Sequence, residues 1–519
     1  MLLADYLDRG FHLAPDAPCM EGPDGTVFMT HREFRDASER IAAQLLADGL
    51  QVGDRVAIFS PNDPWAFACV VGVLRAGGIW TAVNAASGED DLVAFLTLAG
   101  CSRLIYHAAL TERADGLRAR LPAVRSAVSI GPGRPADPSL QDWLPPAGTT
   151  PPRPVVSDAT PAMLAGTGGT TGAPKAVPLT HKQLILMCLA FNAHLHETHP
   201  PRIICAAPMT HAAGPAAFPV MAEGGSVIIH QGVVAADILE SIERNRATRI
   251  YLPPTALYAL LAHPDAQKRD FSSLQHFLVA SSPISPDRLA EAVRVFGPVM
   301  TQVYGQSEAP FICTVLSRED IAAAADDERL RRRLASCGRA SLLARVEIMA
   351  DDGTLLGPEQ EGEIVVRSPL VFDGYWQNPE ATADTRRPGG WHGTGDVGVR
   401  DTNGYIYVVD RKKDMIISGG FNVYPSEVEK VIHTFAEVND CAVIGVPDEK
   451  WGEAVVAVIE PKPDATIDPD AIVAACKSAL GSVKTPKQVL VRTLPRSSIG
   501  KVLKRELREE YWAGRSRRV

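Results

Sequence analysis

The stretch 166–172 reads Gly-Thr-Gly-Gly-Thr-Thr-Gly, and Lys175 follows shortly after it. Glycine allows positive φ angles, so successive backbone N–H groups can turn inward around an anion without a Cβ in the way. The threonine hydroxyls add donors to phosphate oxygens, and the lysine adds a full positive charge. These residues predict a loop that holds the phosphates of a nucleotide triphosphate. A flexible surface turn is the alternative that the loop by itself leaves open.

The loop is not a Walker A motif, in which a lysine and a Ser or Thr follow the last glycine and a helix starts at the phosphates. Here Ala173 and Pro174 separate the last glycine from Lys175, and neither Ser nor Thr follows that lysine. The apolar residues on both sides of the loop predict extended chain. The next helix is expected only after Thr180, where Thr-His-Lys-Gln is typical of a capping box.

Three further clusters could take part in the same chemistry. The run 304–308, Tyr-Gly-Gln-Ser-Glu, offers a glutamate that could hold Mg²⁺ beside a phosphate, since Mg²⁺ favours one or two carboxylates with phosphate oxygens. The run 391–396, Trp-His-Gly-Thr-Gly-Asp, predicts a carboxylate on a glycine turn, placed to accept hydrogen bonds from two ribose hydroxyls. The run 495–501, Pro-Arg-Ser-Ser-Ile-Gly-Lys, offers a lysine as a point charge for a carboxylate and a phosphate. Taken singly, a strand-ending turn, an ordinary β-turn and a solvated surface lysine remain the alternatives.

Composition limits the class of protein. A chain of 519 residues exceeds the size that one hydrophobic core usually serves, so two or more domains are expected. A formal net charge of −9 argues against a nucleic-acid or anionic-membrane partner. The nine cysteines form no C-x-x-C pair and favour free thiols in a reducing cytoplasm. No signal peptide is evident, and the longest apolar stretch is too short to span a bilayer, so no stable membrane association is expected.

The elements that must position these clusters follow from the hydrophobic pattern. Over the first part of the chain a capping box at Thr30 starts a helix, 55–59 is a short apolar strand, and Pro64 starts a second helix. Such alternation predicts βαβ units and a mostly parallel sheet. The patterns over 202–206 and 226–230 repeat this arrangement in a second sheet.

From about Cys337 the pattern changes. Short strand patterns separated by Gly, Asp and Asn predict a β-rich subdomain, and a βα pattern follows the charged cluster 410–414. The fold class predicted is therefore α/β, with a large N-terminal domain over 1–412 and a small mobile α+β C-terminal domain over 413–519. The N-terminal domain would hold two βα-sheet subdomains and the β-rich subdomain.

Taken together, these clusters resemble the motifs of the adenylate-forming (AMP-binding) superfamily of acyl-CoA synthetases, adenylation domains and luciferases. The order is Gly-Thr-Gly-Gly-Thr-Thr-Gly-Ala-Pro-Lys, the run 304–308, the run 391–396, the segment 410–429 and the run 495–501. The resemblance covers essentially the whole chain and is closest over 361–429, where the sequence looks like the acyl-CoA ligase pattern. Five ordered motifs at family spacing are far more specific than any one of them.

The resemblance implies an ATP and AMP site. Its residues would be Thr167, Gly168, Gly169, Thr170, Thr171, Gly172, Lys175, Ser281, Ser282, Pro283, Tyr304, Gly305, Asp396 and Arg411. The first seven would take the ATP phosphates, the next five would surround adenine, and the last two would hold the ribose hydroxyls. Ser307 stands where threonine is usual and would meet the α-phosphate, while Glu308 would ligate Mg²⁺.

The implied reaction has two steps. A carboxylate attacks the α-phosphate of ATP and forms an acyl-adenylate, with Lys501 bridging the carboxylate and the α-phosphate. The C-terminal domain then rotates about Lys413, and Gly419 and Gly420 line a channel through which the CoA thiol reaches the adenylate. In the opening loop Gly168 replaces a common serine, which puts fine nucleotide geometry in doubt but not the reaction class.

The acyl pocket implied by the resemblance is apolar, and the residues that follow its gate are small. Its residues would be His211 as a gate, with Ala212, Ala213, Gly214, Val303 and Ala309. The segment after His211 offers no aspartate for an α-ammonium group, which disfavours amino acids and favours an aliphatic or aromatic carboxylate. A carrier-protein pantetheine as acceptor, luciferase-like oxidation, and a non-catalytic nucleotide-binding protein are the competing hypotheses. The oligomeric state stays open, a homodimer included.

Overall fold

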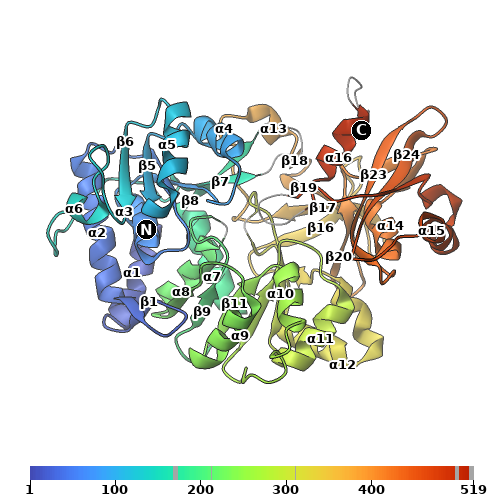
Figure 1. Cartoon of the computed structure of the whole chain (residues 1–519), viewed down its shortest axis with the longest axis horizontal. Helices are drawn as coiled ribbons and strands as arrows, with labels where there is room; N and C mark the ends of the chain where they lie inside the picture. The colour runs from blue at the N-terminus through green and yellow to red at the C-terminus, as the bar shows by residue number, and fades with distance from the viewer. Residues whose placement is uncertain (168–173, 212, 310, 497–501, 513–519) are drawn as a thin grey trace. The chain divides into compact units, whose positions relative to one another are not determined.

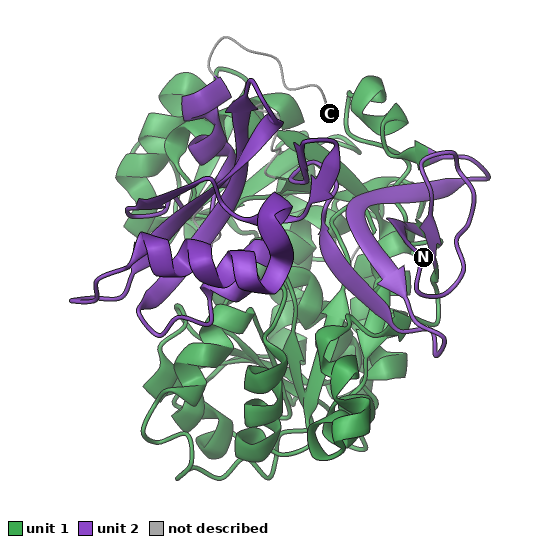
Figure 2. Cartoon of the chain, turned by 90° about the vertical axis from the view of Figure 1, so that its right-hand side faces the viewer, with its two compact units in different colours: residues 1–346, 366–386 green, residues 347–365, 387–519 purple. Residues whose placement is uncertain are grey.

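The computed structural model describes residues 1–167, 174–211, 213–309, 311–496 and 502–512. The chain divides into two compact units, one made of 1–346 and 366–386 and the other of 347–365 and 387–519 (Figure 2). The chain passes between the units within β16 (Arg345–Met349), β17 (Glu361–Arg367) and β18 (Arg386–Arg387). The boundaries between these two units thus differ from the predicted domain boundary between residues 412 and 413, which stays a prediction.

Unit 1 contains a sheet in the order β6-β5-β3-β4-β7-β8 (Figure 1). The first five strands pair in parallel and β8 is antiparallel to β7. The strands are β3 (Arg55–Phe59), β4 (Ile79–Ala82), β5 (Arg103–His107), β6 (Ser126–Ile130), β7 (Pro161–Thr167) and β8 (Lys175–Thr180). The predicted parallel sheet of βαβ units is confirmed.

A second sheet of unit 1 has the order β15-β14-β13-β12-β11-β9-β10-β1-β2. Its strands are β1 (Pro18–Glu21), β2 (Val27–Thr30), β9 (Arg202–Cys205), β10 (Ser226–Ile229), β11 (Arg249–Leu252), β12 (His276–Val279), β13 (Met300–Tyr304), β14 (Thr314–Leu316) and β15 (Arg339–Ala340). The six central strands β13, β12, β11, β9, β10 and β1 pair in parallel. At the edges β2 pairs antiparallel with β1, β14 with β13, and β15 with β14.

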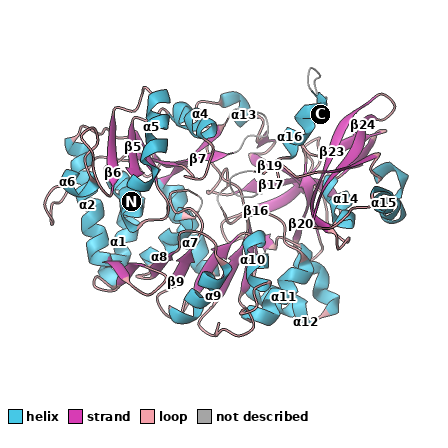
Figure 3. Cartoon of the chain, in the orientation of Figure 1, coloured by secondary structure: helices cyan, strands magenta, loops and turns pink. Residues whose placement is uncertain are grey.

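Helices cover both sheets of unit 1 (Figure 3). They are α1 (Leu3–Leu13), α2 (His31–Ala47), α3 (Pro64–Arg75), α4 (Glu89–Ala99), α5 (Thr111–Arg120), α6 (Leu140–Trp143), α7 (His181–His194), α8 (Gly214–Ala222), α9 (Ala235–Arg244), α10 (Pro254–Leu261), α11 (Pro286–Phe296), α12 (Arg318–Asp326) and α13 (Pro379–Ala383). Short 3₁₀ helices span Ala108–Leu110 and Glu328–Ala335. No helix of the described residues is long and apolar enough to cross a membrane.

Local chemistry explains where the helices beside the site begin. The Thr180 hydroxyl accepts a hydrogen bond from the Gln183 N–H at 3.1 Å, and the Gln183 side chain accepts one from the Thr180 N–H at 2.9 Å. Thr30 and Glu33 form the same reciprocal cap on α2. Each cap satisfies backbone donors that a helix start would otherwise leave without partners. Both predicted capping boxes are confirmed.

Unit 2 contains two smaller sheets. One has the order β16-β17-β19-β18, with β20 (Ile406–Arg411) paired to β19 (Trp391–Arg400). The other has the order β22-β21-β24-β23, with β25 paired to β24. Its strands are β21 (Ile416–Ser418), β22 (Phe421–Val423), β23 (Val438–Asp448), β24 (Gly452–Pro461) and β25 (Gln488–Val491). Helices α14 (Pro425–Ile432), α15 (Pro469–Lys484) and α16 (Lys504–Trp512) complete the unit.

Each unit has its own buried apolar core. In unit 1 the core is formed by the two sheets and α1, α2, α3, α7 and α8, with Trp80 and Phe218 fully buried. In unit 2 the second sheet buries apolar residues on both faces, one against α14 and α15 and the other against α16. Mixed α/β architecture with several sheets and a separate C-terminal α+β portion is confirmed.

Candidate active site

The two strands that flank the glycine–threonine loop are held in register up to its ends. β7 and β8 pair so that Thr167 lies opposite Lys175, and the Thr167 hydroxyl donates to the Lys175 carbonyl at 3.5 Å. The loop's glycines and threonines at 168, 169, 170, 171 and 172 lie outside the described residues. Thr167 and Lys175 are therefore the predicted phosphate ligands whose positions are known.

Lys175 lies beside a tyrosine that bonds to the predicted magnesium ligand. The Lys175 Nζ is 4.9 Å from the ring centre of Tyr375, and the Tyr375 hydroxyl donates to Glu308 Oε1 at 2.6 Å. The Phe372 N–H donates to the Glu308 carbonyl at 2.8 Å, which ties the two segments together a second time. The structure thus gathers Lys175, Tyr375 and Glu308 from three distant parts of the sequence.

The Tyr375 hydroxyl stays protonated at neutral pH. Burial raises the pKa of Tyr375, and the negative charge of Glu308 raises it further. A protonated phenol is a neutral donor, so it fixes the orientation of the Glu308 carboxylate without neutralising its charge. A carboxylate held in this way suits a hard divalent cation such as Mg²⁺.

β13 ends at Tyr304 and residues 305–308 form a turn after it, which matches the strand-ending turn that the sequence left open as an alternative. A Cβ on Gly305 would lie 2.6 Å from the backbone carbon of Phe311, so only glycine fits where the two backbones cross. The Gln306 N–H donates to the Ala309 carbonyl at 3.0 Å and closes the turn that carries Ser307 and Glu308. Val303 and Ala309 are buried on either side of it.

The predicted adenine segment follows β12. Ser281 has a φ of +77°, and its hydroxyl is 3.1 Å from the Tyr251 hydroxyl. Ser281, Ser282 and Pro283 are all exposed. Because Ser281 is not a glycine, its positive φ is a sparsely populated conformation of the kind that clusters at functional sites.

The predicted acyl pocket lies where β9 leads into α8. Burial lowers the pKa of His211, so its imidazole is neutral at pH 7. A Cβ on Gly214 would lie 2.2 Å from the Met209 carbonyl oxygen, which explains the glycine at the start of α8. Ala212 lies outside the described residues.

A narrow apolar cavity adjoins this segment. Small residues of β9, of α8 and of the described segment between them line it together with Tyr251. They are Cys205, Ala206, Ala207, Ala213, Ala216 and Ala217. Phe311 closes this side through aromatic contacts, with its ring centre 6.4 Å from that of Tyr251 and 6.1 Å from that of Phe191. The surroundings of Ala213 are thus apolar, as the sequence predicted.

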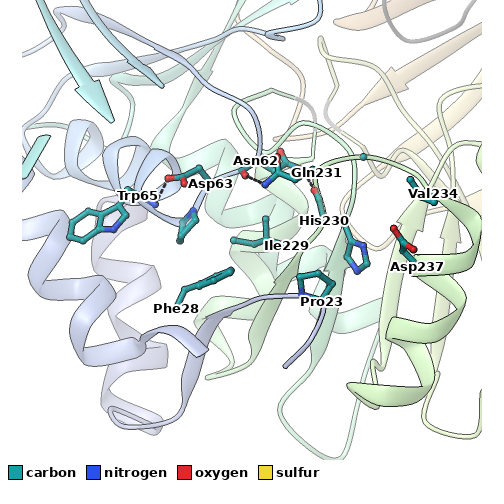
Figure 4. Close-up of a pocket in the computed structure, with 12 residues that line it drawn as sticks. Pro23, Phe28, Asn62, Asp63, Trp65, Ile229, His230, Gln231, Val234 and Asp237 are labelled. Carbon is teal, nitrogen blue, oxygen red and sulfur yellow. Dashed lines mark hydrogen bonds between the residues drawn. The ribbon is translucent and has the colours of Figure 1, made fainter. Parts of the chain in front are cut away.

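A larger cavity of about 520 Å³ lies elsewhere in unit 1 (Figure 4). Phe28 and Trp65 contribute aromatic walls, and Asp63 and Asp237 are acidic. Among the described residues that line it there is no lysine or arginine, and none of the residues predicted for the ATP, acyl or CoA sites is among them. It is therefore separate from the set of residues that the sequence singled out.

In unit 2, Asp396 lies within a strand, so the prediction of a glycine turn is wrong. The residue belongs to β19 and lies directly opposite Arg411 of β20. The Arg411 Nε is 3.0 Å from Asp396 Oδ1, and Asp396 is only 4% exposed whereas Arg411 is exposed. The structure therefore brings the two predicted ribose ligands together as an ion pair. Pairing with β20 outweighs the turn tendency of the two glycines before Asp396.

Glu363 forms a hydrogen bond with the residue directly before Asp396 and was not predicted as a site residue. It is buried and accepts hydrogen bonds from Arg387 at 2.9 Å and from the Gly395 N–H at 3.1 Å. The Thr394 hydroxyl donates to the Ile364 carbonyl, and the Asp396 N–H donates to Thr394. The signal in the sequence was a glutamate directly before the apolar run Ile-Val-Val of a predicted strand.

The predicted hinge and channel residues lie in turns. Lys413 follows β20, and Gly419 and Gly420 join β21 to β22 with φ angles of +60° and +82°. A Cβ on Gly419 would lie 2.9 Å from the Trp451 ring, so this position requires glycine for both its φ and its neighbour. Lys501 lies outside the described residues.

Comparison with known proteins supports the same interpretation. The family model described as AMP-binding enzyme matches residues 7–376, and that of the AMP-binding enzyme C-terminal domain matches residues 427–501. A medium/long-chain fatty-acid–CoA ligase, FadD8 of Mycobacterium tuberculosis, is 37% identical over 95% of this chain and 88% of its own length. A feruloyl-CoA synthase of an Amycolatopsis species is 35% identical over 98% and 99%. Among solved structures, the amide bond synthetase McbA of Marinactinospora thermotolerans has a TM-score of 0.87 at 30% identity and covers 98% of this chain and 100% of its own.

Proposed function

Because the chain belongs to the AMP-binding enzyme family, we propose that it converts an apolar carboxylate into an acyl-adenylate and then into an acyl-CoA thioester. The enzyme is an AMP-forming carboxylate–CoA ligase that uses ATP and CoA. The contact that best supports the assigned roles is the one between Tyr375 and Glu308, with Lys175 beside them. It supports these roles because an oriented carboxylate and the Lys175 cation lie together at one end of the proposed phosphate loop.

In the first step a carboxylate oxygen attacks the α-phosphorus of ATP and pyrophosphate leaves. Both reactants are anions, so Lys175 and Lys501 would offset negative charge where it builds up. Glu308 would hold Mg²⁺, which supplies further charge neutralisation at the phosphates. Tyr375 orients Glu308, and Thr167 adds a hydroxyl donor at the start of the loop. Asp396 and Arg411 would bind the ribose hydroxyls.

In the second step the CoA sulfur attacks the acyl carbon of the adenylate and AMP leaves. AMP is a far better leaving group than the oxide that a free carboxylate would have to expel. Gly419 and Gly420 would line the path of the pantetheine arm, and we propose that residues after Lys413 rotate to present them. A carrier-protein pantetheine would need the same path, so the acceptor is decided by experiment.

The carboxylate is proposed to be apolar and either aliphatic or aromatic. The alanines of α8 and of the described segment between β9 and α8, together with the neutral His211, offer no charged partner for an amino-acid ammonium group. The two curated relatives are named for a fatty acid and for ferulate, one aliphatic and one aromatic. We place the reaction in the cytoplasm, because all nine cysteines are buried and free.

The function is tested by a carboxylate panel assayed for AMP release with and without CoA. We expect aliphatic acids from hexanoate to decanoate, or aryl acids such as benzoate and ferulate, to release AMP together with an equal amount of acyl-CoA. Phenylalanine and octylamine serve as controls and should release none. If AMP release is the same with and without CoA, or needs a carrier protein, the assigned acceptor is wrong; if no carboxylate releases AMP, the whole proposal fails.

Replacing Asp396 with asparagine should raise the KM for ATP. Loss of one charged hydrogen-bond acceptor for the ribose corresponds to about a 10- to 100-fold effect, with a smaller change in kcat. Glu347→Gln is the matched control, since Glu347 pairs with Arg400 in the same sheet at 2.9 Å but belongs to no motif. A KM for ATP that is equal in both variants would contradict the ribose assignment.

A further inference from the structure

The helix that follows Lys501 is joined to the predicted hinge by a half-buried ion pair. Arg508 Nη1 of α16 lies 2.6 Å from Asp414 Oδ1, and the two side chains are only 12% and 15% exposed. Asp414 is the residue directly after Lys413, and its N–H donates to the Arg411 carbonyl at 2.9 Å. Both partners lie in unit 2, which is purple in Figure 2.

A second cation on the same face of α16 makes a similar contact. Lys504 is one helical turn before Arg508, and its Nζ is 2.7 Å from Glu429 Oε1 of α14. Glu429 also accepts a hydrogen bond from the Val443 N–H at 2.7 Å. Residues spaced by four share one face of a helix, so α16 is held through two charged contacts to two different segments.

The electrostatics favour the charged forms of Asp414 and Lys504, whereas burial raises the pKa of Glu429. Burial opposes ionisation of Asp414, but the charges of Arg508 and Lys504 outweigh it and lower the pKa of Asp414. Burial likewise lowers the pKa of Lys504, but the negative charges of Glu429 and Asp410 outweigh this effect. The pKa of Lys504 is therefore raised. Half-buried pairs of this kind cost desolvation and are weak evidence for stability alone, so a positional role is the better explanation for keeping them.

The chain between α16 and the stretch 497–501, which lies outside the described residues, is short and anchored. Val502 pairs with Arg496 in an isolated β-bridge, and the Leu503 N–H donates to the Pro495 carbonyl at 2.8 Å. Leu507 of α16 is 1% exposed and packs into the core of the second sheet. Any displacement of α16 is therefore passed directly to both flanks of the segment that ends in Lys501.

We propose that the Asp414–Arg508 ion pair is a positioning contact that makes α16, and with it Lys501, turn as one body with the residue after the hinge. This rests on the adenylation function and the hinge proposed above. Without the pair, rotation at Lys413 would leave the position of Lys501 less well defined. Adenylation needs Lys501 in place, whereas the attack of the thiol does not, so the first step should suffer more than the second.

The test compares the two half-reactions in variants of the pair. In Asp414→Asn, carboxylate-dependent ATP–pyrophosphate exchange should fall about 10- to 100-fold in kcat, since a misplacement of about 1 Å can cost that much. The KM for ATP and the transfer of supplied acyl-AMP to CoA should each change less than about 3-fold. The exchanged pair, Asp414→Arg with Arg508→Asp, should regain a large part of the lost exchange activity.

Glu510→Gln is the matched control, because Glu510 joins the same helix to Arg492 at 2.9 Å without touching the hinge segment. The rate of each half-reaction in this variant should differ from that of the unchanged protein by less than about 2-fold, as expected for an exposed ion pair. Since Asp414→Asn leaves a half-buried arginine without its partner and could fail to fold, the double variant Asp414→Asn with Arg508→Gln is measured beside it. Equal losses in both half-reactions, or a Glu510→Gln effect as large as that of Asp414→Asn, would overturn the positioning role. Wild-type activity in both assays establishes the proposed function independently of this outcome.

Discussion

Replacing Lys501 with alanine should abolish adenylation while leaving the thioester step largely intact. We expect carboxylate-dependent ATP–pyrophosphate exchange to fall about 10³-fold, the effect of removing a group that offsets charge in the transition state. Transfer of supplied acyl-AMP to CoA should fall less than about 3-fold, because the reacting carbon is already activated. The two half-reactions should differ in their response to this variant because only the first step brings two anions together.

Lys462→Ala is the control for this variant. Lys462 belongs to the same unit and donates to the Ala436 carbonyl at 2.6 Å, but it lies in none of the motifs. It should leave both half-reactions unchanged. A Lys501→Ala variant that loses both half-reactions alike would instead indicate a role in folding or in binding the adenylate, and the assigned role would be withdrawn.

The elements of the fold were predictable where the decisive chemistry is local. Thr180 and Gln183 are three residues apart, so a capping box can be seen in the sequence and is found in the structure. The strand over 55–59 was likewise predicted with its observed bounds, because an apolar run of this length between polar turns fits a strand and is too short for a typical helix. Sheet order was not predictable in the same way, since it depends on pairing between strands far apart in the chain.

In the candidate site, too, features set by neighbouring residues were predictable and contacts between distant segments were not. Glu308 was found from its sequence neighbours, but its hydrogen bond to Tyr375 spans 67 residues and no local pattern indicates it. Asp396 was expected on a glycine turn and lies in a strand, because that strand depends on pairing with distant segments such as β20. Glu363 was missed for a related reason: its partners Arg387 and Gly395 come from other strands. Roles in the site remain proposals, most of all for the residues of the loop 168–173 and for Lys501.

Replacing Glu308 with glutamine should weaken the response to magnesium and slow adenylation. Glutamine keeps the size of the side chain and an oxygen that can accept from Tyr375, but it removes the negative charge that a hard cation needs. We expect the Mg²⁺ concentration for half-maximal ATP–pyrophosphate exchange to rise about 10-fold or more, and kcat at saturating Mg²⁺ to fall about 10²-fold. The measurement is a magnesium titration of the exchange rate at fixed ATP.

Tyr375→Phe separates the charge of Glu308 from its orientation. This variant keeps the carboxylate and removes the 2.6 Å hydrogen bond that fixes it, so we expect a smaller loss of about 3- to 10-fold in kcat. Because the phenol is protonated throughout the neutral range, the loss should not depend on pH between 6 and 8. An unchanged magnesium requirement in Glu308→Gln would remove Glu308 from the metal site. A Tyr375→Phe loss as large as that of Glu308→Gln would mean that orientation matters as much as charge, and would place Tyr375 in contact with the nucleotide itself.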